Sequence, residues 1–565
     1  MKSKQVYSWL LAITFITFGL CDTLMAQDNS VSIAVDVQKT IKPLYPMWAY
    51  FGYDEPNYTY MKDGKKLLGE LAAMSKVPVY VRAHSLLTTG DGKAALKWGS
   101  TNAYTEDASG NPVYNWAIMD SIFDTFIANG IKPIAEIGFT PEAMSTHPVP
   151  YQHHWKPGDP YGDIYTGWAY PPKDYTKWAE LVYQWVKHAV QRYGEAEVKT
   201  WWWEVWNEPN IGYWKGTMEE YFMLYDFTSD AVKRACPSAR VGGPATTGPD
   251  WNVAEDYLRQ FLKHCAEGKN YATGKTGSPL DMISFHAKGS PKVVDGHVRM
   301  NMSPQLRAVA KGFEVVMNSA FKTLPIYITE FDPEGCAACG MTTNPENAYR
   351  NGTMYSSYTA ASFTRLYDLA DLWKVNLAGT ISWSFEFENQ PWFHGFRDLA
   401  THGIDKPVLN VFRMLGMMQG NRIEIKNSSQ IALDSILKNS VRGSRSDIHA
   451  LASANTKSAS VMVWNYHDDD VQAEASSVTL TIKNIKAAKV KLSQYSIDVT
   501  LSNSYEAWKK MGSPQQVSDT QYKLLEKAGQ LQLVSKPEYK TVSKGEVIIQ
   551  LTMPRQAVTL IMVEY

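Results

Sequence analysis

Short apolar runs alternate with amphipathic stretches between Ile41 and Gly420. The intervening stretches repeat apolar residues at helical spacing, as in residues 175–192. Eight such alternations predict an α/β fold, a (β/α)8 TIM barrel over residues 41–420 with its active residues at the C-terminal ends of the strands. The eight expected strands are Pro46 to Tyr50, Val77 to Val81, Lys132 to Ile137, Trp201 to Trp206, Ala239 to Gly243, Met282 to Phe285, Ile326 to Thr329 and Gly379 to Trp383.

The pattern changes to a period of two after Gly420, as in residues 459–464 and 558–563. This alternation is typical of antiparallel strands and predicts a β-sandwich accessory domain over residues 421–565. Within residues 27–40, the segment Val31 to Val37 alternates in the same way and is expected to add a strand to that sandwich. The acidic triplet Asp468-Asp469-Asp470 is interpreted as the solvated tip of a hairpin.

The N-terminus has the features of a secretory signal peptide over residues 1–26. Two lysines precede an apolar stretch from about Val6 to Leu20, and Leu24-Met25-Ala26 offers a cleavage site. Cys21 raises the alternative of a lipid anchor, but Leu20 before it is larger than that processing normally tolerates. We therefore expect a secreted or periplasmic protein with no membrane span.

Length and charge restrict the remaining classes. A chain of 565 residues is too long for one ordinary core, which agrees with two domains. A net charge of -1 offers no polyanion-binding face, so nucleic acid is not an expected partner. The 19 Trp and 32 Tyr suit core packing and also provide flat surfaces for sugar rings. The oligomeric state, including a homo-oligomer, is left open.

Two glutamates follow expected strands and provide the candidate chemistry. Glu208 comes after the strand at 201–206, and Glu330 after the strand at 326–329. Hydrolysis of a glycosidic bond needs two carboxyl groups, one to protonate the leaving oxygen and one to attack or to activate water. Apolar rings near Glu208 favour its protonated form, and Asn207 beside it can bind the 2-hydroxyl group of the sugar.

Glu330 must instead stay ionised, which requires cationic or hydrogen-bonding neighbours. Arg82 ends the second expected strand and stays charged, so its side chain is expected at the mouth of the barrel. His84 and His286 occupy matching strand ends, and Trp383 can present an apolar face to the sugar. All four are candidate substrate-binding residues.

Other chemistries are weakly supported. His153-His154 lacks carboxylates and histidines at ligand spacing, so no metal is expected. Cys336 and Cys339 have redox or metal-ligand spacing but no second pair, which makes zinc improbable. Their expected role is a local disulfide that shapes a loop beside Glu330, and a pair of free thiols is the alternative.

These motifs resemble family 39 of the glycoside hydrolases, the group of β-xylosidases and α-L-iduronidases. The resemblance covers nearly the whole chain beyond the signal peptide. The matching motifs are Trp-Asn-Glu-Pro-Asn at 206–210, Gly242-Gly243-Pro244, Ile283-Ser284-Phe285-His286, Ile328-Thr329-Glu330, and the run at 503–508 with 511–514 after it.

By this resemblance Glu208 is the acid/base and Glu330 the nucleophile of a retaining reaction through a covalent glycosyl-enzyme. Retention implies carboxyl groups about 5 Å apart. The resemblance implies no metal and no organic cofactor. Its substrate would be an oligosaccharide or polysaccharide, attacked from the non-reducing end.

Two departures bear on the substrate. The xylosidases carry a pair of aspartates shortly after the histidine that matches His84, whereas this chain reads Ser-Leu-Leu-Thr-Thr-Gly. After His286 it has Ala287-Lys288-Gly289, similar to the iduronidase branch, and Lys288 is suited to pair with a substrate carboxylate.

The favoured prediction is an exo-acting β-xylosidase that degrades xylan-derived or related plant polysaccharide fragments. The first alternative is an α-L-iduronidase-like or other uronic-acid glycosidase that uses Lys288. A catalytically silent carbohydrate-binding protein is the second alternative. The presence of both Glu208 and Glu330 argues against it, because binding alone needs neither an acid nor a nucleophile.

Overall fold

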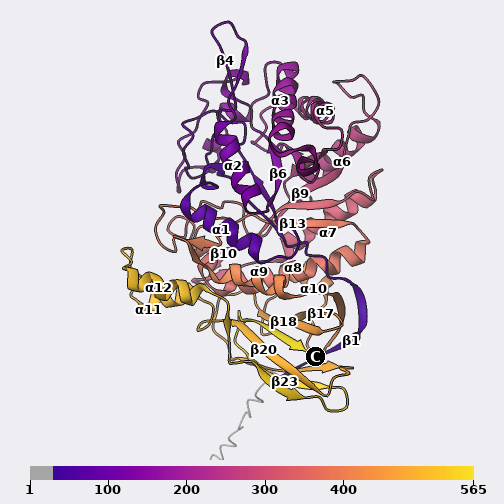
Figure 1. The fold of residues 1–565 in the computed structure, drawn as a ribbon, viewed down its shortest axis with the longest axis vertical. Coiled ribbons are helices and arrows are strands. Elements are labelled where there is room, and N and C mark those ends of the chain that lie inside the picture. Colours follow the sequence, from indigo (N-terminus) through magenta and orange to yellow (C-terminus); the bar gives the residue numbers. More distant parts are fainter. Residues whose placement is uncertain (1–29) are drawn as a thin grey trace, which may run out of the picture.

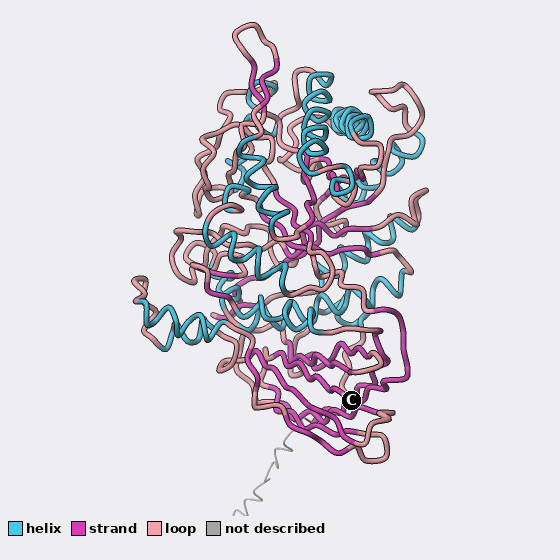
Figure 2. The backbone as a smooth tube through the Cα atoms, viewed as in Figure 1, coloured by secondary structure: helices cyan, strands magenta, loops and turns pink. Residues whose placement is uncertain are grey.

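The computed structural model describes residues 30–565. The expected signal peptide over residues 1–26 and Cys21 lie outside the described residues. Within the described part, a barrel surrounded by helices stands above a domain built mainly of strands (Figure 1, Figure 2).

Eight parallel strands close into a barrel, which confirms the predicted TIM-barrel fold. The first two strands begin later than their apolar runs. The first residues that pair with neighbouring barrel strands are Tyr50 and Tyr80. In chain order the strands are β2(Tyr50–Tyr53), β3(Tyr80–Ala83), β6(Lys132–Ile137), β7(Trp202–Val205), β8(Arg240–Thr246), β9(Met282–Lys288), β12(Ile326–Asp332) and β13(Leu377–Ser382).

A helix follows each barrel strand and covers it from outside. In the third of these helices Asp174 caps the first turn, and Trp178, Leu181 and Trp185 recur at helical spacing and are buried. Burial of that face against the strands fixes the helix to the barrel. The helices are α1(Lys62–Ala73), α2(Ala117–Ala128), α3(Tyr175–Tyr193), α5(Met218–Ala235), α6(Asn252–Glu267), α7(Ser303–Met317), α8(Thr353–Trp373) and α9(Pro407–Met417).

The second domain contains a 10-stranded sheet and agrees with the predicted β-sandwich architecture. The strand at Ser30–Pro43 lies inside this sheet, third from one edge, between an antiparallel and a parallel neighbour. The sheet is therefore mixed, whereas the alternating pattern predicted antiparallel pairs alone. Its strands are β1(Ser30–Pro43), β16(Asn421–Asn427), β17(Asp447–Ala454), β18(Ser458–Tyr466), β19(Ser476–Lys483), β20(Lys489–Ile497), β21(Gln532–Leu533), β22(Glu538–Thr541), β23(Val547–Met553) and β24(Val558–Glu564).

Three short helices interrupt the strand-rich domain: α10(Leu433–Asn439), α11(Ser504–Lys510) and α12(Asp519–Gly529). The last two form the arm on the left of Figure 1. In both, a polar side chain caps the first turn, Asn503 in α11 and Ser518 in α12.

The acidic triplet joins the two domains, so its interpretation as a solvated hairpin tip is wrong. A hairpin on the loop after β9, β10(Lys292–Val294) and β11(His297–Arg299), packs against it. Met300 N donates to Asp468 O at 2.9 Å, and Arg299 forms an ion pair with Asp469. The charge of Asp469 is therefore compensated by the barrel domain, and that of the buried Asp468 by Arg442 of its own domain.

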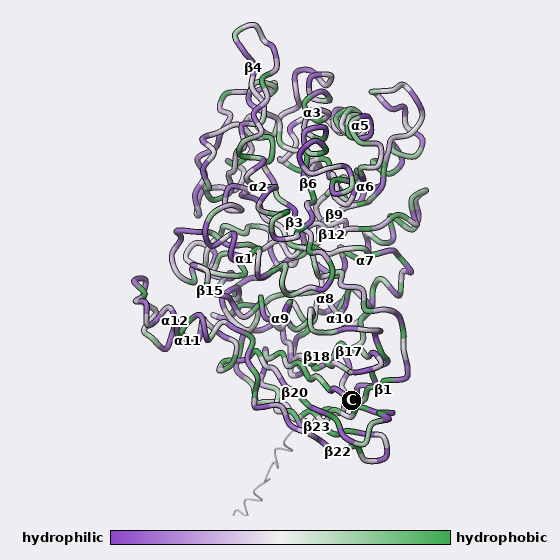
Figure 3. Tube along the Cα trace, viewed as in Figure 1, coloured by the Kyte–Doolittle hydropathy of each residue, from purple (hydrophilic) through white to green (hydrophobic). Residues whose placement is uncertain are grey.

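Hydrophobic positions occur in short stretches along the helices and strands (Figure 3). Among residues 30–565, no helix combines the length and the apolar character that crossing a bilayer requires. The other short elements include β4(Tyr104–Glu106), β5(Pro112–Tyr114), β14(Ala400–Thr401), β15(Ile404–Asp405) and the 3-10 helix η5(Pro345–Asn351).

Candidate active site

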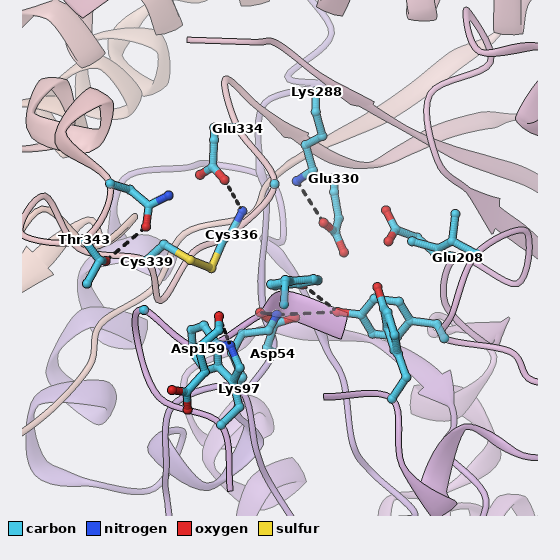
Figure 4. Close-up of a pocket in the computed structure, with 18 residues that line it drawn as sticks. Asp54, Lys97, Asp159, Glu208, Lys288, Glu330, Glu334, Cys336, Cys339 and Thr343 are labelled. Carbon is cyan, nitrogen blue, oxygen red and sulfur yellow. Dashed lines mark hydrogen bonds and ion pairs between the residues drawn. A yellow bond between two sulfur atoms is a disulfide. The ribbon is translucent and has the colours of Figure 1, made fainter. Parts of the chain in front are cut away.

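A pocket of about 650 Å³ opens at the C-terminal ends of the barrel strands, within the size range of small-molecule sites. Figure 4 shows Glu208 and Glu330 beside each other, with the Cys336–Cys339 disulfide on the far side of Glu330. The pocket also receives side chains from the loops after β2, β3, β6, β7 and β12 and from the last residue of β9. These are Asp54, Lys97, Trp155, Asp159, Tyr161, Tyr165, Tyr213, Lys288, Glu334, Thr343 and Asn344.

Glu330 lies within β12 and is 5% exposed. Its Oε2 is 2.8 Å from Nζ of Lys288, and its Oε1 is 3.2 Å from a terminal nitrogen of Arg82. Two cationic side chains therefore hold the carboxylate from two sides while it still borders the pocket.

The electrostatics of the site favour the ionised form of Glu330. Burial opposes ionisation, but the charges of His286, Lys288 and His84 outweigh it, and the pKa of Glu330 lies well below its ordinary value. Arg82 contributes in the same direction. Glu330 is consequently ionised across the physiological pH range, as a nucleophile requires.

Glu208 lies on the loop after β7, and a constrained backbone directs it into the pocket. Both Trp206 and Glu208 have positive φ angles, 69° and 43°, which bulky residues adopt only when their surroundings impose them. Glu208 N donates to Ala245 O at 2.9 Å, and Oε1 is 2.8 Å from Nδ1 of His286. His286 and the β8 strand end therefore fix the carboxyl group in place.

Glu208, His286 and Glu330 each bring one potential ligand atom within 4.8 Å of the others. A cation at this point would also meet Lys288 and Arg82, both of which are ion-paired with Glu330. Because their charge already compensates that carboxylate, the set is better suited to acid–base and nucleophilic chemistry than to holding a metal.

Arg82 is the centre of a fully buried charge network beneath the pocket. Its guanidinium forms ion pairs with Glu136, Glu204 and Glu330, and donates to Oδ1 of Asn207 at 3.0 Å. Arg82 therefore orients two of the candidate residues and does not itself line the pocket.

Glu136 and Glu204 were not predicted from the sequence. Each is an acidic residue in the buried part of a barrel strand, β6 or β7, and both are fully buried. Such a residue in a strand could have indicated a buried ion pair, because a buried carboxylate requires a charged or hydrogen-bonding partner.

His84 and Trp383 are buried behind the pocket wall and do not themselves line the pocket. His84 Nδ1 is 3.0 Å from Oδ1 of Asp54, and its Nε2 is 2.9 Å from Glu136. Burial alone would lower the pKa of His84, but the charge of Glu136 and these hydrogen bonds raise it to about 9. Trp383 is 1% exposed and packs against His84, with ring centroids 4.4 Å apart. Direct contact of Trp383 with a sugar stays a prediction.

The Cys336–Cys339 disulfide forms a wall of the pocket. The side chain of Arg350, fully buried, supports this wall by donating to the carbonyl oxygens of Cys336, Ala337 and Cys339. Its ion pair with Glu334 completes the attachment. The expected disulfide thus shapes a loop beside Glu330, as the spacing suggested.

A sequence profile described as "Glycosyl hydrolases family 39" matches residues 31–545. The chain belongs to glycosyl hydrolase family 39. Among family members, a β-xylosidase of Geobacillus stearothermophilus is 28% identical over 455 residues, which cover 77% of this chain and 77% of that relative. An α-L-iduronidase of Mus musculus is 23% identical over 549 residues, 90% of this chain and 77% of the relative.

Solved structures of family 39 members have the same fold. A monomeric β-xylosidase from Caulobacter crescentus CB15 superposes with a TM-score of 0.74 at 24% identity, covering 94% of this chain and 99% of that chain. A bacterial orthologue of human α-L-iduronidase gives 0.74 at 16% identity, covering 95% and 84%. Both branches therefore share the barrel and the sandwich with this chain.

Proposed function

We propose that this family 39 glycosidase is a retaining, exo-acting β-xylosidase that works by double displacement. The observation that carries the proposal is the pair Glu208 and Glu330, which line one pocket with carboxylate oxygens within 4.8 Å of each other. Retaining glycosidases hold their carboxyl groups about 5 Å apart, whereas inverting enzymes leave room for a water molecule. The short separation supports retention.

In the first step, Glu330 attacks the anomeric carbon while Glu208 gives its proton to the departing oxygen. In the second step, Glu208 takes a proton from the water that releases the sugar from Glu330. The cationic neighbours of Glu330 keep it ionised before the attack. The hydrogen bond between His286 and Glu208 and the strained backbone hold Glu208 at the leaving-group side.

Three observations support, in turn, the xylosidase assignment, the exo mode and the proposed location. Relatives described as β-xylosidases, from Geobacillus stearothermophilus and Caldicellulosiruptor saccharolyticus, are both 28% identical to this chain. The pocket is walled by loops from several strands, which suits the end of a saccharide better than its middle. The disulfide at Cys336–Cys339 suits an oxidising compartment, in line with secretion or export to the periplasm.

A uronic-acid glycosidase is the second candidate, and Lys288 favours it. This residue ends β9, lines the pocket and places its ammonium group 2.8 Å from the nucleophile candidate. A substrate carboxylate entering beside Glu330 would meet that ammonium group. The α-L-iduronidase relatives are consistent with such a substrate.

A panel of aryl glycosides, including β-xylosides and α-L-iduronides, tests both candidates. The hydrolysed sugar is then used as its 2-fluoro derivative, and the labelled peptide is located by mass spectrometry. We expect hydrolysis of the β-xyloside and a label on Glu330, with Glu330→Gln inactive but still able to bind sugar. A label on any other side chain would overturn the assignment, and binding without any turnover by the wild type would support a silent carbohydrate-binding protein.

A further inference from the structure

A second ion pair lies in the pocket wall, apart from the residues assigned to the chemistry. Nζ of Lys97 is 2.6 Å from Oδ2 of Asp54, and their side chains are 4% and 8% exposed. Both residues line the same pocket as Glu208 and Glu330. Figure 4 shows the pair below Glu330, on the side opposite Lys288.

The position of Lys97 is fixed from several directions. Its backbone has a φ of 58°, a left-handed conformation that is uncommon for lysine. Lys97 N donates to Oε1 of Glu55 at 2.7 Å, and Lys97 O is 3.0 Å from Nε2 of His153. The ammonium group lies 5.5 Å from the centre of the Tyr161 ring. A buried ion pair often contributes little to the stability of a fold. Strained backbone conformations are concentrated at functional sites. The fixed position of Lys97 therefore indicates a role in binding.

The pair still has hydrogen-bonding capacity facing the pocket. The ammonium group of Lys97 carries three donors, of which one meets Asp54 and another reaches the hydroxyl of Tyr213 at 3.5 Å. Each oxygen of Asp54 holds one partner, Lys97 or His84, and retains a second acceptor site. A donor and an acceptor held side by side match two adjacent hydroxyl groups of a sugar.

The pair also lies close to the reacting centre. Asp54 is bonded to His84, whose Nε2 is 3.5 Å from Oε1 of Glu330. The end of β2 and the loop after β3 thus supply a carboxylate and an ammonium group near that histidine.

We propose that Asp54 and Lys97 bind neighbouring hydroxyl groups of the sugar whose anomeric carbon faces Glu330, and so determine which glycone is accepted. This inference rests on the proposed glycosidase function. Asp54 accepts a hydrogen bond from one hydroxyl, and Lys97 donates to the oxygen of the next. A sugar that lacks either hydroxyl loses a hydrogen bond to a charged group.

The test combines variants with deoxy substrates. Wild type, Lys97→Met and the double variant Asp54→Asn/Lys97→Met are compared on an aryl β-xyloside and on its 3-deoxy and 4-deoxy analogues. The double variant removes both charges, so neither is left buried without a partner. Lys132→Met is the matched control, because Lys132 pairs with Glu197 at 2.6 Å outside the pocket.

We expect at least one deoxy analogue to lower the kcat/KM of the wild type by roughly 10- to 100-fold, the effect of a lost hydrogen bond to a charged group. The double variant should lose at least a similar factor on the parent xyloside and show little further loss on that analogue, whereas Lys97→Met should lose discrimination only against the analogue that lacks the hydroxyl bound by Lys97. The Lys132→Met variant should show the same ratio of kcat/KM between the parent xyloside and each deoxy analogue as the wild type. If Asp54 and Lys97 had a purely structural role, their replacement would lower kcat/KM by the same factor on all three substrates.

Two results would overturn the proposal. One is full wild-type discrimination in the folded double variant, and the other is a wild type indifferent to both deoxy positions. Failure of the proposed function is seen separately, as a wild type that hydrolyses no aryl glycoside and takes no 2-fluoro label on Glu330. In that event the binding of xylose to wild type and double variant, measured by calorimetry, decides whether Asp54 and Lys97 bind sugar at all. Equal affinities would refute the proposal.

Discussion

The ammonium group of Lys288 lies 2.8 Å from Oε2 of Glu330, and both residues line the pocket. Burial and the charge of Arg397 lower the pKa of Lys288, whereas Glu330 raises it. Lys288 therefore stabilises the charge of the carboxylate and is also positioned to meet a charged substituent of the substrate. Its substitution separates these two roles.

Replacement of Lys288 by Met should move the acidic limb of the pH profile of kcat/KM upward. A cation beside a carboxylate lowers the pKa of that carboxylate, so its removal raises the pKa of Glu330 and protonation begins at a higher pH. The measurement is kcat/KM on the hydrolysed aryl glycoside from about pH 3 to pH 8, where such limbs are resolved. Lys288→Arg keeps the charge and serves as control; an unshifted limb in Lys288→Met would contradict the electrostatic role.

Replacement of Glu208 by Ala should slow the hydrolysis of substrates with poor leaving groups far more than that of activated aryl glycosides. General acid catalysis contributes roughly 10²- to 10⁴-fold, and a good leaving group needs little of it. Added azide should restore turnover of activated substrates by attacking the glycosyl-enzyme, giving a glycosyl azide of retained configuration. Equal loss on both substrate types, without azide rescue, would remove Glu208 from the acid/base role.

Replacement of Arg82 by Met should destabilise the protein by about 3 to 5 kcal/mol, the usual cost of breaking a buried ion pair from one side. Arg82 is fully buried, and its loss leaves Glu204 in β7 without a cationic partner and Glu136 in β6 with His84 alone. Urea denaturation measures the change. Arg192→Met is the control, because the side chains of Arg192 and its partner Asp124 are 40% and 47% exposed. Its loss should lower the free energy of unfolding by less than about 1 kcal/mol.

His84 should make stability depend on alkaline pH. Its folded-state pKa of about 9 lies above the ordinary value of 6.5, so its contribution is full below pH 6.5 and is lost as the pH rises through about 9. Such a shift corresponds to at most about 3 kcal/mol. The free energy of unfolding of wild type and His84→Gln, compared over this range, should converge at alkaline pH. Parallel curves would show that His84 is neutral in the folded protein.

The alternation of apolar runs and amphipathic stretches was sufficient to predict the barrel. Strands such as Lys132–Ile137 are largely buried, so most of their residues are apolar. The locations of Glu208 and Glu330 followed because the ends of parallel strands meet at one face of a barrel. Local pattern and topology therefore account for the central part of the site.

The remaining parts of the site depend on contacts between distant segments. Asp54 and Lys97 meet only when the loops after β2 and β3 fold over the barrel. The acidic triplet at 468–470 looked solvent-exposed because its partners, such as Arg299, lie about 170 residues away. The local pattern of apolar and polar residues does not indicate such pairs. A charged residue in the sequence does not reveal which distant residue it pairs with.

The contact between Arg299 and Asp469 limits how the molecule can be divided. The hairpin that carries Arg299 belongs to the loop that leaves β9 just after Lys288, and the strand-rich domain holds it by a backbone bridge as well as by charge. A barrel excised at residue 420 would leave that loop without its outer support. Attempts to shorten the enzyme, or to transplant its catalytic half into a fusion, should carry the C-terminal half along.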